Sequence, residues 1–380
     1  MTKLRDICRF QSGGTPSRGT PAYFNGNVPW ITTVALNGDV IDGNQAIEWI
    51  TDEAIAKSAA KIVPPHSVMV GTRVGIGKVA INSVPMSTSQ DIISLIGIDE
   101  NKWDKKFICH LITANKEHLT SQARGATIKG IKIEAIADLV LPEISLKEQA
   151  RISEVIGKVD ALMHMHQQMA MNLEQLIKSR FIELFGDYDL THPQESWVTI
   201  KEIGTVVGGA TPKTDHDEYW GGSYRWITPA ELDGDSGYIY DSVRKLTKAG
   251  VESCSLQEMP VGTVILSSRA PIGKVAIAGN TFYCNQGFKN IICKEGITPR
   301  YLYTVLLLNV EYLNSLGRGA TFKEISKGIV ESIRIPVPSM ELQQQFAAFV
   351  EQTDKSKLAV QKGLQELEIL KKTLMQQYFG

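Results

Sequence analysis

Residues Leu146 to Gly186 read LKEQARISEVIGKVDALMHMHQQMAMNLEQLIKSRFIELFG, and no proline interrupts them. Apolar residues return in a seven-residue rhythm, which is typical of a long helix with one apolar stripe. The stripe contains Ile152, Val155, Ile156, Val159, Leu162, Met163, Met169, Leu173, Leu176 and Ile177. A helix of about forty residues is roughly 60 Å long. Such a helix needs a partner to cover its stripe.

A second stretch of the chain can supply that partner. Residues Met340 to Gly380 read MELQQQFAAFVEQTDKSKLAVQKGLQELEILKKTLMQQYFG and also end in Phe-Gly. We expect the two helices to pair antiparallel as a coiled coil. The residues expected in this interface are Ile152, Val159, His166, Leu173, Phe346, Val360, Leu367 and Leu374. We interpret His166 as a locally hydrogen-bonded residue that helps to fix the register, not as a catalytic group. His164 lies two positions away and on another face, which argues against a metal pair.

The two long stretches belong to an internal repeat that spans the chain. Thr15-Pro16 recurs as Thr211-Pro212, 196 positions later, and Trp30-Ile31-Thr32 recurs at the same offset as Trp226-Ile227-Thr228. The offset has become 194 where Arg124-Gly-Ala-Thr recurs as Arg318-Gly-Ala-Thr. So much agreement indicates that one unit, a globular segment followed by a long helix, is written twice.

Each globular segment has the pattern of a strand-rich α/β (α+β) domain. Short runs such as VPWITT, SVMVG, KVAIN and DIISLIGI, separated by Gly, Pro, Asn and Asp, predict strands. Residues 107–119 and 301–316 predict helices, and the polar residues 187–196 predict an exposed linker. We therefore divide the chain into a first globular segment, a first helix, a linker with a second globular segment, and a second helix. Their boundaries are residues 1–145, 146–186, 187–339 and 340–380.

Composition limits the classes of function. The chain has 380 residues, of which 43% are hydrophobic and 21% charged, and it contains neither a membrane-length apolar run nor a signal-peptide pattern. We therefore expect a cytoplasmic protein without membrane contact. The five cysteines form no C-x-x-C pair, so no metal site or disulfide framework is indicated. A net charge of −1 means that any grip on DNA must be local or shared with a partner.

Catalytic motifs are missing from the sequence. A methyltransferase acting on an exocyclic amine would need a D/N-P-P-Y/F loop and a glycine-rich cofactor loop, and neither is present. The stretch from Gly71 to Lys78 resembles a phosphate loop, but five residues separate Gly71 from Gly77 and Val79 replaces the required Ser or Thr. We find no G-x-S-x-G or H-E-x-x-H either. The sequence therefore predicts a non-catalytic protein that holds no cofactor and no metal.

A set of polar residues recurs among small residues in both halves. Arg, Lys, Gln and Thr are the side chains that contact bases and phosphates, which makes these residues candidates for DNA binding. They are Arg73, Lys78, Gln90, Arg124, Thr127, Lys129, Arg269, Lys274, Gln286, Arg318, Thr321 and Lys323. An equal alternative is that the Arg and Lys residues make structural hydrogen bonds. Residues that read bases should differ between the halves if each half reads a different sequence, so those residues should lie in divergent loops.

The order of these motifs resembles the specificity subunit of type I restriction–modification systems over essentially the whole chain. T-P, W-I-T, I-G-K-V-A-I, R-G-A-T-x-K and a Pro seven residues before a Gln each occur twice. The resemblance implies two target recognition domains and two conserved spacer helices, without catalysis of their own. One departure is Trp197, which has no counterpart at the start of the first half.

The resemblance also implies partners. These are double-stranded DNA, two methyltransferase subunits that modify adenine, and nuclease–translocase subunits in the full complex. S-adenosylmethionine, ATP and Mg are then expected only on the partner subunits. Two recognition domains on a spacer imply a bipartite site whose halves lie about one DNA turn, roughly 34 Å, apart.

Two other functions remain open from the sequence. The chain could be a coiled-coil interaction scaffold without DNA readout. It could also be a self-sufficient DNA methyltransferase or endonuclease, against which the missing catalytic motifs argue.

Overall fold

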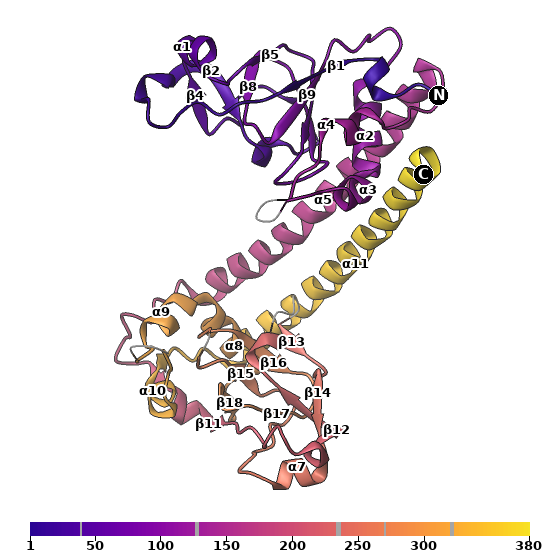
Figure 1. Cartoon of the computed structure of the whole chain (residues 1–380). Coiled ribbons are helices and arrows are strands. Elements are labelled where there is room, and N and C mark those ends of the chain that lie inside the picture. The colour runs from indigo at the N-terminus through magenta and orange to yellow at the C-terminus, as the bar shows by residue number, and fades with distance from the viewer. Residues whose placement is uncertain (39, 126–128, 233–236, 270, 320–322) are drawn as a thin grey trace. The chain divides into compact units, whose positions relative to one another are not determined.

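Two compact units make up the chain, and each contains parts of both long helices. The structure is a computed structural model that describes all residues except 39, 126–128, 233–236, 270 and 320–322 (Figure 1). The first unit comprises Met1–Gln167 and Lys362–Gly380, and the second comprises Gln168–Gln361.

The first unit is built on a five-stranded sheet. Its strands, in spatial order, are β1 (Arg9–Ser12), β9 (Ile92–Ile96), β6 (Val68–Gly71), β7 (Val79–Asn82) and β3 (Val40–Ile41). All neighbours are antiparallel except β3 and β7. Apolar residues of β6 and β9 pack against Ile108, Leu111 and Ile112, which lie on one face of helix α2 (Lys105–Ala114). Helices α3 (Lys116–Ser121) and α4 (Ile133–Ala137) complete this core.

A second, four-stranded sheet carries the Trp30 motif. Its order is β4 (Glu48–Ile50), β2 (Phe24–Ile31), β8 (Met86–Thr88) and β5 (Ile62–Val63), with helix α1 (Asp52–Lys57) next to β2. The Trp30 indole Nε1 donates to the carbonyl oxygen of Gly14 at 3.1 Å. A Cβ at Gly14 would lie 2.0 Å from the Ala59 carbonyl oxygen, so only glycine allows the chain to pass here. Trp30 therefore fixes the loop that carries Thr15-Pro16.

The second unit repeats this topology. Its five-stranded sheet has the order β11 (Gly204–Gly208), β18 (Lys289–Cys293), β15 (Val264–Leu266), β16 (Val275–Ala278) and β13 (Tyr238–Ile239). A three-stranded sheet contains β14 (Arg244–Leu246), β12 (Trp220–Ile227) and β17 (Tyr283–Cys284), and the short helix α7 (Lys248–Glu252) packs on it. Helices α8 (Pro299–Leu308), α9 (Val310–Ser315) and α10 (Lys327–Ser332) take the places of α2, α3 and α4. The duplication therefore extends to strand order.

In both units the start of the globular segment pairs with the chain just before the long helix, although only the second unit has a tryptophan there. After Trp197, β10 (Val198–Thr199) pairs antiparallel with β19 (Arg334–Ile335) and leads into α6 (Ile200–Ile203). In the first unit an isolated bridge joins Lys3 to Val140, and the Leu141 amide donates to Thr2 at 2.8 Å. The first residues of the chain thus make the corresponding pairing without a counterpart of Trp197.

The expected helices 107–119 and 301–316 are each two helices. Asn115 separates α2 from α3, and Asn309 separates α8 from α9. Each asparagine donates its side-chain Nδ2 to a carbonyl four residues earlier, at 2.9 Å. Asn side chains compete in this way with the helical hydrogen-bond pattern, which explains the breaks.

The linker 187–196 is less exposed than expected. Leu190 is only 1% exposed, and its amide donates to Asn309 Oδ1 at 3.3 Å. The Tyr188 ring packs edge-on against Phe181 and Trp197. The residues from Thr191 to Ser196 are exposed. The linker is therefore anchored to the core of the second unit by two apolar side chains.

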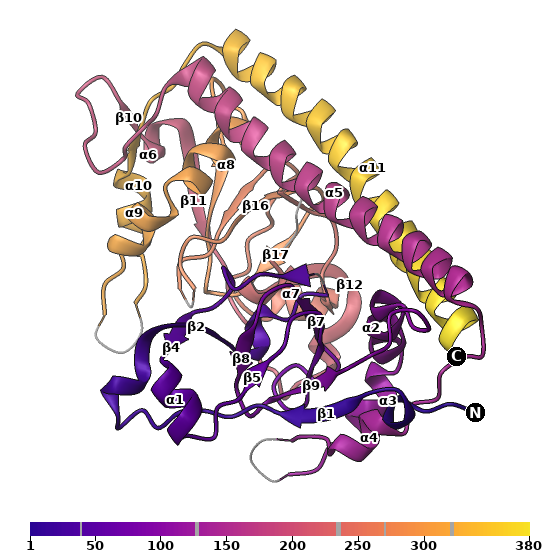
Figure 2. The same cartoon turned by 90° about the horizontal axis from the view of Figure 1, so that it is seen from above.

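The long helices are α5 (Leu146–Phe185) and α11 (Met340–Phe379), and they pair antiparallel within each unit (Figure 2). In the first unit, Asp160 forms an ion pair with Lys371, and His166 lies against Gly363. In the second unit, the Lys357 ammonium lies 2.7 Å from Glu174, and the Phe181 and Phe346 rings are 5.4 Å apart. In both units the residue numbers rise along one helix while they fall along the other.

All the expected interface residues are at least partly buried. Ile152, Val159, Phe346 and Val360 are buried, whereas His166, Leu173, Leu367 and Leu374 are half-buried. The His166 Nδ1 atom is 2.9 Å from the carbonyl oxygen of Leu162 in the preceding turn. Other stripe residues are not covered by this chain. Leu162, Met169, Leu176 and Leu370 are all more than 40% exposed.

Candidate nucleic-acid interface

A threonine–glutamine pair marks the same place in both units. Thr15 donates its hydroxyl to Gln90 Oε1, and Thr211 donates to Gln286 Oε1. The loops that carry the threonines are fixed by backbone hydrogen bonds from Gly14 to Thr88 and from Ala210 to Cys284. The threonine bonds only to the carbonyl oxygen, and among the described residues nothing accepts from the amide of the exposed glutamine, so its N–H groups remain for another partner. A glutamine amide is the side-chain group that matches adenine.

Two other candidates of the first unit, Arg73 and Arg124, lie near this pair. Thr72 bonds through its amide and hydroxyl to the carbonyl of Asp91, which follows Gln90. Arg73 lies 3.5 Å from the Asp91 carboxylate and is half-exposed. Gly130, which pairs through the backbone with Arg124, packs on the Arg73 side chain. The fold thus brings Gln90, Arg73 and Arg124 from three segments onto one surface.

The second unit assembles the equivalent surface. Arg269 and Arg318 both pair through the backbone with Glu324. Lys289 donates to the Glu324 carboxylate at 3.1 Å and to the Ser268 hydroxyl at 3.3 Å. Ser268 in turn bonds to the carbonyl of Gly287, which follows Gln286. Lys289 was not among the sequence candidates because the first half has Ile93 at that position.

The remaining candidates are of two kinds. Lys78, Lys129 and Lys323 have exposed side chains. The Lys274 ammonium is 3.2 Å from the Pro229 carbonyl oxygen and half-buried, which favours a structural role. Thr127 and Thr321 lie outside the residues that the structure describes.

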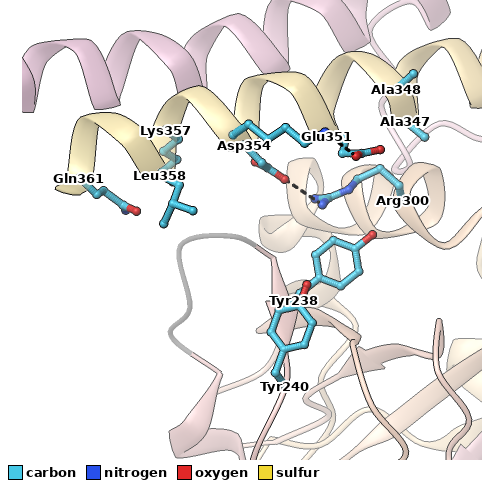
Figure 3. A pocket seen from close by; sticks show the side chains of 11 residues that line it. Tyr238, Tyr240, Arg300, Ala347, Ala348, Glu351, Asp354, Lys357, Leu358 and Gln361 are labelled. Carbon is cyan, nitrogen blue, oxygen red and sulfur yellow. Dashed lines mark hydrogen bonds and ion pairs between the residues drawn. The ribbon is translucent and has the colours of Figure 1, made fainter. Parts of the chain in front are cut away.

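A groove separates α11 from the domain in the second unit (Figure 3). It has a volume of about 740 Å³. Arg300 donates to Asp354 of α11 at 3.1 Å, and its guanidinium lies 4.7 Å from the Tyr238 ring. Tyr238 stacks with Tyr240 at a centroid distance of 5.9 Å. Burial raises the pKa of the Asp354 carboxyl, and Arg300 partly opposes this effect.

An equivalent groove of about 900 Å³ lies between α5 and the domain in the first unit. Lys106 and Asp160 line it at the positions that correspond, 194 residues earlier, to Arg300 and Asp354. His110 also lines it, and burial lowers the pKa of its imidazole. The duplicated chain therefore has the same groove twice, with different chemistry.

The described residues contain no cluster of His, Cys, Asp and Glu that could hold a metal ion. Among the described helices, none has both the length and the apolar character that crossing a membrane requires. Burial raises the pKa of the Cys109 and Cys284 thiols to about 12. Both cysteines are therefore unreactive at neutral pH.

Comparison with known proteins identifies the class. The model of the type I restriction modification DNA specificity domain matches residues 1–175 and again residues 195–369. The chain therefore belongs to this family, as the motifs predicted, and is a specificity subunit of a type I restriction–modification system. Such subunits are non-catalytic and carry no cofactor.

Curated relatives agree with this assignment. The type I restriction enzyme MjaIX specificity subunit of Methanocaldococcus jannaschii is 42% identical over 185 residues, covering 47% of this chain and 43% of the relative. The EcoR124I/EcoR124II specificity subunit of Escherichia coli is 26% identical over 241 residues, covering 61% of this chain and 58% of the relative. The putative MjaX specificity subunit of M. jannaschii is 23% identical, covering 99% of this chain and 91% of the relative. The first two alignments thus span about half the length of those relatives.

Solved structures confirm the fold. The S subunit of the type I system from M. genitalium superposes with a TM-score of 0.58 at 17% identity, covering 100% of this chain and 95% of that one. A chain from a study of complex assembly and conformational transition of the type I R-M system gives 0.61 at 16% identity, covering 100% and 96%. The expected α+β class, with two strand-rich segments and two long helices in contact, is confirmed.

Proposed function

We propose that this chain reads a bipartite double-stranded DNA site, one half through each globular segment. The observation that carries the proposal is the duplicated surface built around Thr15–Gln90 and Thr211–Gln286. Each copy presents an amide and several exposed cations from separate loops, the side chains that contact bases and phosphates. In this reading residues 1–145 and 187–339 contain the target recognition domains, and residues 146–186 and 340–380 are the spacer helices.

The partners are two methyltransferase subunits and, in the full complex, nuclease–translocase subunits. A net charge of −1 is too low for a protein that holds DNA by itself, so the partners share the contacts to phosphate. The exposed apolar residues of α5 and α11, among them Met169, Leu176 and Leu370, need a cover in the complex. The equivalent grooves in the two units suit two copies of one partner, because each copy would meet corresponding elements of the repeat, α5 in one unit and α11 in the other.

The test is the sequencing of methylated adenines in cells that express this chain with its neighbouring methyltransferase. The expected result is a bipartite motif with one modified adenine in each half. An absence of any motif, with a methyltransferase that is active beside another specificity subunit, would leave the coiled-coil scaffold as the better account.

A charge-removal variant tests the assigned surface in DNA-binding titrations of the purified complex at several salt concentrations. Arg73→Gln with Arg269→Gln should weaken DNA binding by the complex and reduce its salt dependence. Lys61→Gln, at an exposed position outside the surface, is the control. Equal binding by the complexes with the wild-type chain, the double variant and the control would show that the two arginines do not contact DNA.

A further inference from the structure

A stacked arginine stands out on the small sheet of the second unit. Arg244 of β14 lies over the Trp220 ring of β12, with its Cζ atom 3.4 Å from the ring centroid. The Trp226 ring is 5.7 Å from the same atom, and the two indoles meet edge-on at 5.1 Å. Within the described residues, the Arg244 side chain makes no ion pair with a carboxylate. Its guanidinium plane is therefore held while the side chain remains exposed.

The two indoles tie Arg244 to the candidate DNA surface. Trp226 donates its Nε1 to the Ala210 carbonyl at 3.0 Å, and Trp220 donates to the Lys213 carbonyl at 3.2 Å. Between these two residues lies Thr211, which bonds to Gln286. Arg244, through the two indoles, and Gln286, through Thr211, are therefore linked to the same loop, and both are exposed.

The first unit has a cation on an aromatic ring at the same place, but supplies it from another position. Phe24 and Glu48 stand where the second unit has Trp220 and Arg244. Arg18, from the loop after Thr15-Pro16, lies 5.6 Å from the Phe24 ring centroid. Its two terminal nitrogens donate to the Glu48 carboxylate at 2.7 and 2.9 Å. The bidentate ion pair occupies N–H groups of the Arg18 guanidinium, whereas no described carboxylate pairs with Arg244.

Two domains that recognise different DNA sequences should differ in their base-contacting side chains, and the two units differ in this way at Glu48 and Arg244. A guanidinium held on an aromatic ring loses little freedom when it binds, and its N–H groups form a planar fork. Arginine forking onto the O6 and N7 atoms of guanine is the commonest specific contact in the major groove. The carboxylate of Asp241, three residues before Arg244, is already shared by Arg225 and Lys245 at 3.1 Å.

We propose that Arg244 is a specificity-determining residue that contacts a guanine in the half-site read by the second domain. The equivalent place in the first domain, closed by Arg18 and Glu48, reads no guanine. This inference rests on the proposed DNA-reading function and names one base contact within it.

The experiment uses the complex of the full chain with its methyltransferase and records the methylated motif and binding to a randomised DNA library. Arg244→Ala should remove the preference for guanine at one position of one half-site, a discrimination of roughly 10- to 100-fold. The other half-site should stay unchanged. Arg244→Lys should retain overall affinity but also lose the guanine preference, because lysine has no planar fork. Arg225→Ala, on the neighbouring strand, and Arg18→Ala are matched controls that should leave the motif intact.

Each other outcome overturns a defined part of the proposal. If Arg244→Ala weakens binding equally at all sequences and Arg244→Lys restores it, the residue contacts phosphate and not a base. If Arg18→Ala relaxes a guanine in the other half-site, the first site is not closed. If the wild-type chain gives a motif that Arg244→Ala leaves unaltered, this inference fails while DNA reading stands. Thermal melting of each variant complex separates these results from misfolding.

Discussion

In each half of the chain, one buried glutamine joins the recognition domain to the long helix that follows it. Gln149 and Gln343 follow the first turn of α5 and α11 and are 1% and 0% exposed. The Gln343 carbonyl oxygen accepts from the Thr298 amide at 2.8 Å, and its amide donates to the carbonyls of Gly296 and Pro338. Gln149 makes the equivalent three bonds. The repeat identified these residues as matching, but their role depends on contacts across about 45 residues, which spacing along the sequence cannot show.

Truncation of the Gln343 side chain should destabilise the folded chain. Gln343→Ala leaves three backbone groups without their partner, so we expect the free energy of unfolding to fall by about 2–4 kcal/mol. Gln344→Ala, at the exposed neighbouring position, should change it by less than about 0.5 kcal/mol. Urea denaturation of the two variants provides the comparison. Equal stabilities would show that the glutamine bonds are replaced by water without loss.

His110 should make the first unit sensitive to acid. Burial lowers the pKa of the imidazole below its usual 6.5, although Asp160 and Asp104 oppose that effect and Lys371 and Lys106 add to it. The unfolded chain therefore takes up a proton at higher pH than the folded chain, and stability falls as the pH drops below about 6.5. His110→Gln should flatten the dependence of the melting temperature on pH between roughly 6.5 and 5. An unchanged slope would assign the acid sensitivity to other groups.

The helix pair has one close contact that can be tested by a double-mutant cycle. A Cβ at Gly363 of α11 would lie 2.8 Å from the His166 Nε2 atom of α5. His166 is also held by the Leu162 carbonyl, so the ring has a preferred position. The role of His166 in setting the register stays a prediction, and this contact provides a way to test it.

Gly363→Ala should therefore stabilise the chain more when His166 is removed than beside the native histidine. Alanine in a helix interior is favoured over glycine by about 1 kcal/mol. We expect the full gain in a His166→Ala background and a gain smaller by at least about 0.5 kcal/mol beside the native histidine. Gly157→Ala in α5, where no atom lies within 4 Å of an added Cβ, is the control and should give the full gain in both backgrounds. Additive effects would show that the imidazole moves aside freely.

Secondary structure could be predicted where the pattern is local and not where a tertiary contact decides it. The long helices follow from the apolar rhythm, and their observed bounds differ from the expected ones only at the final glycines. The breaks at Asn115 and Asn309 were missed because asparagine within an apolar helical pattern looks like a tolerated polar residue. The burial of Leu190 was missed because a single leucine in a polar linker carries no periodic signal.

At the scale of the whole chain, duplication made part of the candidate site predictable. Residues that recur in both halves, such as Gln90 and Gln286, could be found by aligning the chain with itself, and the fold places them beside equivalent loops. Arg244 could not be found in this way, because its counterpart is Glu48 and its stacking depends on the register of β12 with β14. The sequence thus identified the shared framework, whereas the structure was needed to rank the divergent positions.

The same duplication predicts that the two recognition domains act independently. Each unit has its own sheets, its own buried core and its own Thr–Gln pair. The buried Gln149 and Gln343 each join one domain only to the long helix that follows it. Replacing residues 1–140, which include both Lys3 and its strand partner Val140, by another recognition domain should change one half of the methylated motif and leave the other half and the spacing unaltered. Sequencing of methylated adenines gives both halves in one measurement. A chimaera that replaces residues 1–140 with the same residues carrying silent codon changes controls for expression. A change in both halves would mean that readout by one domain depends on the other, so that the specificity of the chain would be a property of the assembled pair.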